Sequence, residues 1–418
     1  MKIIIVGGGL LGLSSAKVLQ ERGHDVELLE AGDGVALESS YANGGILTAS
    51  MSDPWNGPGV HKHMMASLFD PYSPMKVHPK AIPSLFFWGL KFLRNSTKKS
   101  HRAATEANYH LTKYSVEKTK MLREKLGLNY DSAEGGTVKL FRHKEAMAAP
   151  LALAKKMTKL GLIYHELDAE QTVALEPQLF GVRDQICSAL YFPTDERGDA
   201  YLFCKELERE FILSGGIIRK NVSVSSFVVK KDAVTGVESD QGVIQADKVV
   251  VAAGNQSPDL LKTAHLSIPI KPVKGYSVTL GLYDNITMPA IPVIDDSMHA
   301  AVTPLGKRLR IAGTAEFIGF DTRIEQKRID NLFTILEGLY PHIASQISRQ
   351  DAQTWAGLRP MSCDGKPFIG PSKIKGLYLN TGHGHLGWTM AMGSAYLLAD
   401  LLESRTTEID AQPFQATR

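Results

Sequence analysis

Residues 2–30 read KIIIVGGGLLGLSSAKVLQERGHDVELLE, and this stretch decides the fold. Residues 3–6 are continuously apolar and β-branched, as expected for a strand that is buried on both faces. A glycine-rich turn follows, and then a helical pattern that ends before Gly23. Residues 25–29 predict a second strand, which ends at the acidic Glu30. This order predicts a βαβ unit that binds a dinucleotide.

The turn fits the pattern G-x-G-x-x-G, in which each glycine has a physical role. Gly7 permits the tight turn, Gly9 lets the backbone approach a pyrophosphate, and Gly12 lets the helix pack on the strand. Free N–H groups at the helix N-terminus can bind the phosphates, and Glu30 can bind both hydroxyls of the adenosine ribose. The alternative is an ordinary glycine-rich βα turn, which the flanking strands, helix and acidic residue together disfavour.

A second glycine-rich turn between a strand and a helix favours FAD over NAD. Residues 377–380 predict a strand, and TGHGHLGW (381–388) follows as the turn. A long apolar helix is predicted at about 390–402. Another buried strand is predicted at VVVAAG (249–254), after three short strands within 222–244. FAD is long, and a second helix N-terminus aimed at the flavin ring would stabilise negative charge on its reduced form.

Composition excludes several classes of protein. The 418 residues suffice for two or three domains, and a net charge of +3 leaves no basic excess for nucleic acid. The three cysteines, Cys187, Cys204 and Cys363, form no CxxC pair, which favours a reducing compartment over a disulfide scaffold or zinc site. The N-terminal apolar run is too short for a signal-peptide core, and no stretch reaches the 18 or more uninterrupted apolar residues of a membrane span. We therefore expect a soluble, cytoplasmic protein, or one bound peripherally to the inner face of the cell membrane.

Seven stretches resemble the FAD-dependent D-amino acid oxidase and dehydrogenase superfamily, and its bacterial D-amino acid dehydrogenases most of all. They are GGGLLGLSSA (7–16), ALESSYANGG (36–45), PWNGPGV (54–60), GGTVKLFR (135–142), PVKGYSVT (272–279), WAGLRPMSCDGKPFIG (355–370) and LNTGHGHLGWTMAMGS (379–394). The resemblance implies a mixed α/β (α+β) fold, with a Rossmann-like FAD-binding domain of the glutathione-reductase type and a substrate domain with a mixed antiparallel sheet. Both domains are expected to be discontinuous: FAD-binding near 1–55, 198–266 and 355–418, substrate-binding near 56–197 and 267–354.

The predicted FAD-binding residues come from five places in the chain. Besides the glycine turn and Glu30, the resemblance implies that the small polar loop 39–45 runs along the cofactor. The full set is Gly7, Gly9, Leu10, Leu11, Gly12, Glu30, Ser39, Ser40, Asn43, Gly44, Gly45, Ala253, Gly254, Gly384, Leu386, Gly387, Trp388 and Thr389. Some relatives attach flavin through a cysteine, at the position that Gly357 holds here. Cys363 lies elsewhere in the motif, so non-covalent FAD is expected.

Arg359 is the expected anchor of a substrate carboxylate. A guanidinium has a planar fork of donors that matches a carboxylate, and Pro360 fixes the backbone after it. The resemblance implies the same role for the arginine of this motif. Such a clamp orients Cα against flavin N5 for hydride removal, and the reaction needs no side-chain base. The imino acid would then hydrolyse to a 2-oxo acid and ammonia.

Tyr276 and His299 are secondary candidates for the substrate pocket. The Tyr276 hydroxyl could lie near the carboxylate, while the alternative is a half-buried strand tyrosine. His299 could titrate near neutral pH, although an ordinary exposed histidine is the favoured alternative. Relatives often carry a tyrosine where Met298 stands, which puts side-chain specificity in doubt. His383 and His385 are spaced too tightly for a metal site, so we expect no metal and place both histidines in a flavin-side loop.

The leading functional hypothesis is D-amino acid dehydrogenation, with electrons passed to a quinone-like acceptor rather than to oxygen. The alternatives are oxidation of D-hydroxyproline, glycine or secondary amines such as sarcosine, and a flavoprotein subunit without turnover. Residues 81–93 (AIPSLFFWGLKFL) are apolar and aromatic. Further apolar residues precede them at Met64, Met65, Leu68 and Phe69, and basic residues follow at Arg94, Lys98 and Lys99. The segment 81–99 could lie on an anionic membrane surface, where a quinone resides. The favoured alternative is a buried helix of the substrate domain.

Overall fold

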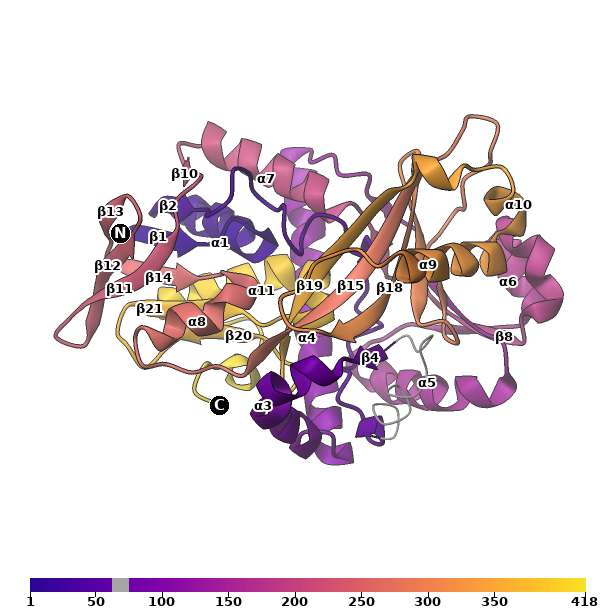
Figure 1. Ribbon diagram of the computed structural model, residues 1–418, viewed down its shortest axis with the longest axis horizontal. Coiled ribbons are helices and arrows are strands. Elements are labelled where there is room, and N and C mark those ends of the chain that lie inside the picture. The colour runs from indigo at the N-terminus through magenta and orange to yellow at the C-terminus, as the bar shows by residue number, and fades with distance from the viewer. Residues whose placement is uncertain (62–74) are drawn as a thin grey trace.

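The computed structural model describes residues 1–61 and 75–418, and its two main sheets lie side by side (Figure 1). The predicted mixed α/β fold is confirmed by the order of helices and strands. Met64, Met65, Leu68 and Phe69 lie outside the described residues.

The first sheet is the predicted dinucleotide-binding sheet, with β1 near its centre. Its strand order is β10-β2-β1-β14-β21-β20, parallel throughout except for β20. Ile3 and Ile5 pack on one face with the helices, whereas Ile4 and Val6 pack on the other with a small three-stranded sheet. The strands are β1 (Lys2–Val6), β2 (Asp25–Leu29), β10 (Ile217–Arg219), β14 (Lys248–Val251), β20 (Phe368–Pro371) and β21 (Leu377–Thr381), and the small sheet is β11 (Val224–Lys230), β12 (Ala233–Ser239) and β13 (Gly242–Gln245).

The second sheet is mixed, and β19, followed by β15, forms its edge nearer the first sheet (Figure 1). Its order is β19-β15-β18-β17-β16-β6-β8-β7, and β4 pairs with β18. Helix α9 (Gln326–Leu339) packs against it around a core of aliphatic residues (Figure 1). The strands are β4 (Met75–Val77), β6 (Thr137–Phe141), β7 (His165–Leu167), β8 (Ser188–Phe192), β15 (Ile270–Gly281), β16 (Val293–Asp295), β17 (Ala300–Leu305), β18 (Arg308–Phe317) and β19 (Gln353–Ser362).

Two elements pack differently from the domain division that the resemblance implied. Helix α4 (Lys98–Leu126) falls in the segment assigned to the substrate domain, yet it packs into the core of the first sheet. Strand β19 begins at Gln353 and pairs with β15 along its whole length, so the boundary at residue 355 cuts an element of the second sheet. Both departures have the same cause. An apolar helix face or a strand edge packs against residues that are distant in the sequence, and domain boundaries drawn along the sequence do not take such contacts into account.

The remaining elements complete the two layers and the link between them. Helices α1, α7 and α11 cover the first sheet, and a short sheet of β3, β9 and β5 lies beside the second. Their bounds are α1 (Leu10–Glu21), α3 (Ile82–Arg94), α5 (Lys144–Met157), α6 (Ala169–Leu175), α7 (Ala200–Leu213), α8 (Ser257–Lys262), α10 (Pro341–Ala344), α11 (Gly387–Leu402), β3 (Ile46–Leu47), β5 (Ala133–Glu134) and β9 (Glu196–Arg197).

Candidate active site

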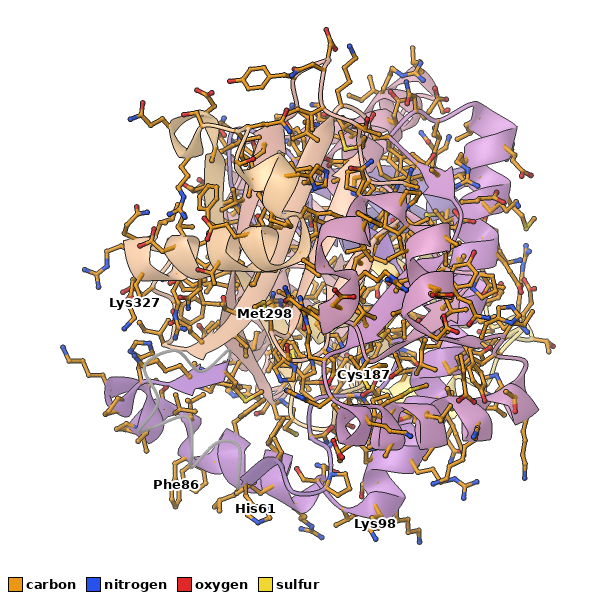
Figure 2. The ribbon with its side chains drawn as sticks, turned by 90° about the vertical axis from the view of Figure 1, so that its right-hand side faces the viewer. His61, Phe86, Lys98, Cys187, Met298 and Lys327 are labelled. Carbon is orange, nitrogen blue, oxygen red and sulfur yellow. The ribbon has the colours of Figure 1, made fainter. Side chains whose placement is uncertain are left out.

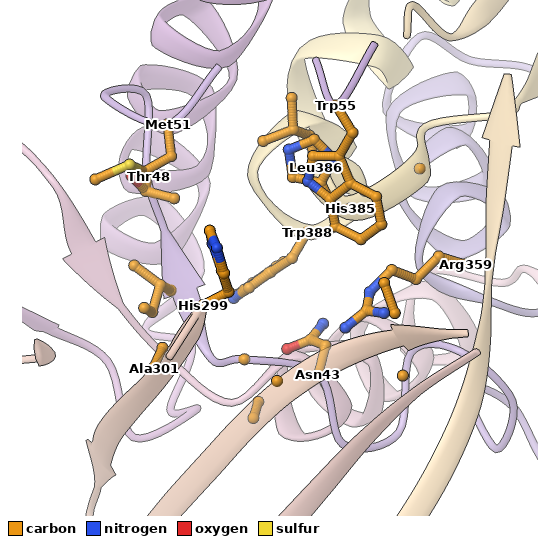
Figure 3. Close-up of a pocket in the computed structure, with 18 of the residues that line it drawn as sticks. Asn43, Thr48, Met51, Trp55, His299, Ala301, Arg359, His385, Leu386 and Trp388 are labelled. Carbon is orange, nitrogen blue, oxygen red and sulfur yellow. The ribbon is translucent and has the colours of Figure 1, made fainter. Parts of the chain in front are cut away.

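A cavity of about 1000 Å³ is lined by residues from both sheets. Its walls come from the loop after β2, from β15, β18 and β19, and from the turn that begins α11 (Figure 3). Asn43, Arg359 and His385 enter it from three different segments of the chain. The second glycine-rich turn and the arginine of the Gly-Leu-Arg-Pro motif therefore meet in one space.

The first glycine turn has the geometry of a phosphate-binding turn. Gly7 adopts φ +107°, and a Cβ there would lie 2.7 Å from the carbonyl oxygen of Ala252. A Cβ on Gly12 would lie 1.8 Å from the Gly7 carbonyl oxygen, so only glycine lets the helix close onto the turn. By contrast, the nearest atom to a Cβ on Gly9 would be the Ser40 hydroxyl oxygen, at 3.5 Å. The open space beside Gly9 and the N-terminus of α1 fit the pyrophosphate of a dinucleotide.

Glu30 sits at the end of β2, beside the same turn. One carboxylate oxygen accepts a hydrogen bond from Gly8 N at 2.7 Å, and the other accepts one from Gly32 N at 2.8 Å. These contacts fix the carboxylate at the carboxyl edge of the first sheet, where dinucleotide ribose groups bind in folds of this kind.

The predicted cofactor residues divide between the cavity and the edge of the first sheet. Those lining the cavity are Leu10, Leu11, Ser39, Ser40, Asn43, Gly44, Gly45, Gly384, Leu386, Gly387, Trp388 and Thr389. The turn glycines and Glu30 lie at the edge of the sheet, and Ala253 and Gly254 follow β14 there. The arrangement is long, as a cofactor with two nucleotide halves requires.

Several of these side chains already have partners in the protein. The Ser40 hydroxyl accepts a hydrogen bond from Leu10 N at 3.1 Å, and the Thr389 hydroxyl accepts one from Thr48 N at 3.1 Å. The Trp388 indole donates to the Gly198 carbonyl oxygen at 3.1 Å and packs in the core. Their side chains thus stabilise the walls of the cavity, which leaves backbone groups to contact a cofactor.

Both histidines of the second glycine turn line the cavity. His383 Nε2 lies 2.9 Å from the Ser394 hydroxyl, and burial lowers the pKa of this histidine to about 3. His385 stacks on Trp55 with 4.9 Å between ring centroids, and burial lowers its pKa to about 4. Both are therefore neutral at physiological pH. Among the described residues, no cluster of three His, Cys, Asp or Glu side chains has a metal-binding arrangement.

Arg359 carries a positive charge that the protein itself does not neutralise. No carboxylate in the described part of the chain forms an ion pair with it, and its Nη1 donates to the Thr314 carbonyl oxygen at 3.0 Å. Burial lowers its pKa to about 10, so the guanidinium remains charged at neutral pH. A buried cation without a counter-charge is costly unless a ligand supplies one, and a carboxylate has the matching shape.

Tyr276 is among the residues that line the cavity, and its hydroxyl is bound by a carboxylate of the protein. The side chain is buried, and its hydroxyl donates to Glu316 Oε2 at 2.9 Å. Gly275 precedes it on β15 and faces the Arg359 guanidinium, so the tyrosine points to the other face of the sheet, into the core beneath α9. Its hydroxyl is thus held by a buried carboxylate on that face.

His299 lines the cavity and is exposed, with a left-handed backbone at φ +48°. Figure 3 shows it and Arg359 on different walls of the cavity. Met298 packs toward Gly338 of α9 and is not among the residues lining the cavity, so it does not occupy a donor position in the pocket. Of these two residues, therefore, His299 is the one that lines the cavity.

The sequence analysis missed a buried carboxyl group behind the wall of the cavity. Asp195 accepts hydrogen bonds from the Thr48 hydroxyl at 2.8 Å and the Ser50 hydroxyl at 2.6 Å. These contacts hold a segment whose Thr48 and Met51 line the cavity. Burial raises the pKa of Asp195 to about 6 despite the hydrogen bonds. No spacing in the sequence signals this cluster, because its members come together only through β3 and β9.

Asp195 gives the protein a pH-dependent stability. Because its folded pKa of about 6 lies above its unfolded value, the stability it contributes is present at low pH and is lost as pH rises through 6. Asp195→Asn cannot ionise, so its unfolding free energy should improve relative to that of the unmodified protein between pH 4.5 and 8 by roughly 2 kcal/mol, which is the part of the two-unit pKa shift that falls within this pH range. Denaturant unfolding at both pH values measures this, and a constant difference would contradict it.

The fold and the shared cavity define a flavoprotein oxidoreductase, and comparison with known proteins agrees. Residues 2–401 match the family model described as FAD dependent oxidoreductase (DAO). The chain therefore belongs to this family of FAD-dependent oxidoreductases. It is 35% identical over 418 residues to D-amino acid dehydrogenase 1 of Mesorhizobium japonicum, covering 100% of this chain and 99% of that protein. Against the D-amino acid dehydrogenase of Methylobacterium nodulans it is 38% identical over 419 residues, with coverage of 100% and 99%.

Known structures show the same architecture. A glycine oxidase from Bacillus cereus superposes with a TM-score of 0.74 and 25% identity, covering 97% of this chain and 98% of that chain. An L-proline dehydrogenase from P. horikoshii superposes with a TM-score of 0.78 and 19% identity, covering 100% and 97%, which shows the fold alone. FAD is the cofactor of the family, and the residues around the two glycine turns fit it.

Proposed function

We propose that this protein is a D-amino acid dehydrogenase and that Arg359 binds the substrate carboxylate. The observation that carries the proposal is the half-buried Arg359 guanidinium, which lines the cavity without a carboxylate partner among the described residues. Relatives named D-amino acid dehydrogenase match the chain over its whole length. A planar donor fork in a low-dielectric pocket selects a carboxylate and fixes the orientation of the carbon attached to it.

The chain's own residues supply orientation and a dry environment for the reaction. FAD, when bound, supplies the two-electron acceptor for the hydride that leaves Cα. Arg359 holds the carboxylate, and the stacked rings of Trp55 and His385, which line the same cavity, limit access of water to Cα. The neutral amine lone pair forms the C=N bond as the hydride leaves. Water then hydrolyses the imino acid to a 2-oxo acid and ammonia.

The most direct test is anaerobic bleaching of the bound flavin by a panel of substrates. D-amino acids, their L-enantiomers, glycine, sarcosine and D-hydroxyproline are added separately, and the loss of oxidised flavin absorbance is followed. Rapid bleaching by D-amino acids supports the proposal. Bleaching only by glycine or secondary amines would favour the alternative substrates, and no bleaching by any of them would favour a subunit without turnover.

We also propose that the FAD is held without a covalent bond. Gly357 lines the cavity at the position where some relatives carry an attachment cysteine, and it has no side chain to form one. Cys363 lies in a separate core cluster around Trp88, and burial raises the pKa of its thiol to about 11. A buried, protonated thiol is a poor nucleophile.

The electron acceptor that we propose is a quinone, reached from a membrane surface through α3. The inner face of the helix is fixed by Trp88, whose indole donates to the Pro269 and Met361 carbonyl oxygens at 3.1 and 3.2 Å. Its outer face is apolar and exposed, through Ile82, Phe86, Phe87, Leu90 and Leu93. The helix is thus only half buried, which differs from the fully buried helix favoured by the sequence analysis.

Basic residues border this outer apolar face. Lys91 and Arg94 lie in the last turn of α3, and Lys98 and Lys99 begin α4, all exposed. Figure 2 shows Phe86 projecting from the same edge of the molecule as Lys98. An apolar face bordered by cations is the pattern of a segment that lies on an anionic lipid surface. Among the described residues, no helix is long and apolar enough to cross a membrane.

Vesicle binding tests the membrane proposal. The protein should sediment with anionic vesicles at low salt. Phe86→Ser with Lys98→Glu should weaken binding roughly tenfold or more, because an apolar contact is lost and a cation is replaced by an anion. Activity with a soluble dye should not change. Phe180→Ser with Lys373→Glu makes the same chemical changes at exposed positions elsewhere and serves as the control. Equal binding by both variants, or rapid hydrogen peroxide formation without quinone reduction, would overturn this proposal.

A further inference from the structure

Arg359 lies in a cradle formed by three segments that are distant in the sequence. Gly275 of β15, Thr314 of β18 and Trp55 of the loop after β3 surround its guanidinium, and we call these three residues the arginine cradle. All three line the same cavity as Arg359. The geometry of each contact indicates how the orientation of the guanidinium is fixed before any substrate binds.

Gly275 provides the floor of the cradle. A Cβ built at this position would lie 2.2 Å from Arg359 Nη1, 2.3 Å from Nη2 and 2.4 Å from Cζ. These distances are far below van der Waals contact, so the guanidinium occupies the space that any side chain here would need. The backbone of Gly275 does not require glycine, because its φ is not in the left-handed region. Contact with the arginine is therefore the reason that the structure gives for glycine at this position.

Thr314 lies in a β-bulge, and its carbonyl oxygen accepts the hydrogen bond that Arg359 makes within the arginine cradle. Lys274 pairs with Glu316 and Tyr276 with Gly313, so β18 has one residue more than β15 in this interval. Thr314 adopts φ +62°, a strained conformation for a β-branched residue, and its carbonyl oxygen accepts from Arg359 Nη1 at 3.0 Å. Bulges beside functional sites commonly redirect one group in this way.

Trp55 provides the cover of the cradle. The Arg359 Cζ lies 5.6 Å from the centroid of its indole ring, within the range of a cation–π contact. The indole also stacks on His385, which is neutral at physiological pH and so does not repel the guanidinium. The contacts with Gly275, Thr314 and Trp55 leave the remaining N–H donors of the guanidinium for a ligand.

We infer that Gly275 is a positioning residue for substrate binding. Together with the carbonyl of Thr314 in the bulge and the indole of Trp55, it fixes the orientation of the Arg359 guanidinium. The inference rests on the proposed role of Arg359 as the carboxylate anchor. A methyl group at position 275 would push the guanidinium off β15, away from the Thr314 carbonyl, and so misalign the donor fork. Misplacement of a positioning group is enough to lower turnover strongly even when every contacting residue is retained.

A double-mutant cycle tests this inference. Gly275→Ala should raise the apparent KM and lower kcat/KM by on the order of tens-fold or more, because the carboxylate loses its paired fork. In the Arg359→Met background, Gly275→Ala should have no further effect, since the group that it displaces is absent. Gly281→Ala on the same strand is the matched control, because a Cβ there meets no atom within 4 Å.

A binding measurement separates positioning from a general loss of structure. Pyruvate, the 2-oxo acid that D-alanine would give, is titrated into the oxidised holoenzyme, and the change in the flavin spectrum is followed. Gly275→Ala should weaken pyruvate binding by a similar factor to its effect on KM, with normal FAD content. Trp55→Phe should retain binding and Trp55→Leu should weaken it.

The outcomes distinguish the inference from the proposed function. If Arg359→Met itself keeps kcat/KM within about threefold, the carboxylate anchor is wrong, because a buried charged pair contributes far more than this. If Arg359→Met is strongly impaired but Gly275→Ala behaves like Gly281→Ala, only the positioning role is overturned. Losses that multiply in the double variant would likewise overturn it, because the two residues would then act independently.

Discussion

Replacing Arg359 with methionine will raise the apparent KM steeply and lower kcat/KM by tens- to thousands-fold. The side chain is half-buried, charged and without a carboxylate partner in the described part of the chain, so the substrate carboxylate is its expected counter-charge. Loss of a buried, hydrogen-bonded charge pair costs about 2–5 kcal/mol, which corresponds to this range. Steady-state kinetics with a D-amino acid and a soluble dye measure the effect.

Arg359→Lys should recover little of the lost activity, because a point charge does not reproduce the planar fork and a buried ammonium deprotonates more readily than a guanidinium. FAD content should be normal in both variants. Arg102→Met, which removes an exposed arginine of α4, is the control. Activity within about threefold of the unmodified enzyme in either Arg359 variant would show that the carboxylate is held elsewhere, since the loss of a buried charged pair is much larger.

The second large effect concerns Gly9, where a valine should abolish FAD binding without unfolding the protein. The backbone there is extended, at φ −76° and ψ −174°, which a valine can adopt, and a Cβ meets only the Ser40 hydroxyl at 3.5 Å. The side chain would instead occupy the space of the pyrophosphate. Losing two charge-assisted hydrogen bonds at about 1.5–3 kcal/mol each weakens binding by roughly a hundredfold or more.

The measurement is the flavin released into the supernatant when the purified protein is denatured, together with the unfolding temperature of the apoprotein. The unmodified protein should release its FAD, since we expect no covalent link. Gly9→Val should be colourless with a normal unfolding temperature compared with unmodified apoprotein. Gly12→Ala is the contrasting variant, because its Cβ would lie 1.8 Å from the Gly7 carbonyl oxygen and should destabilise the fold itself. Yellow Gly9→Val protein would contradict the proposed path of the pyrophosphate.

The elements around the first glycine turn could be predicted from the sequence because their signals are local. The run of residues 3–6, the spacing of Gly7, Gly9 and Gly12, and the acidic end of β2 lie within thirty residues, and the structure places each where expected. The strand and helix around the second glycine turn were equally clear, although α11 begins at Gly387, earlier than the apolar pattern suggested. Burial of both faces and helical periodicity are properties of neighbouring residues, so one segment suffices to reveal them.

The orientation of side chains at the site could not be predicted in the same way. Tyr276 and Gly275 are adjacent in the motif that suggested a pocket tyrosine, yet the alternation of a strand sends only one of the two positions toward Arg359. Which face of β15 borders the cavity depends on how β18, β19 and α9 pack around it. The orientation of α3 could not be predicted either. Its composition was compatible with burial or with exposure, and in the structure one face of the helix is buried and the other is exposed.

By itself the sequence determined that this chain binds a dinucleotide, that its fold is mixed α/β, and that an arginine in a Gly-Leu-Arg-Pro motif is the candidate anchor. Only the tertiary structure decided that this arginine is half-buried without a counter-charge in the described chain, lies on Gly275, and is covered by Trp55. The physical reason is that desolvation, ion pairing and steric contact depend on which distant segments approach one another. No local pattern encodes those distances.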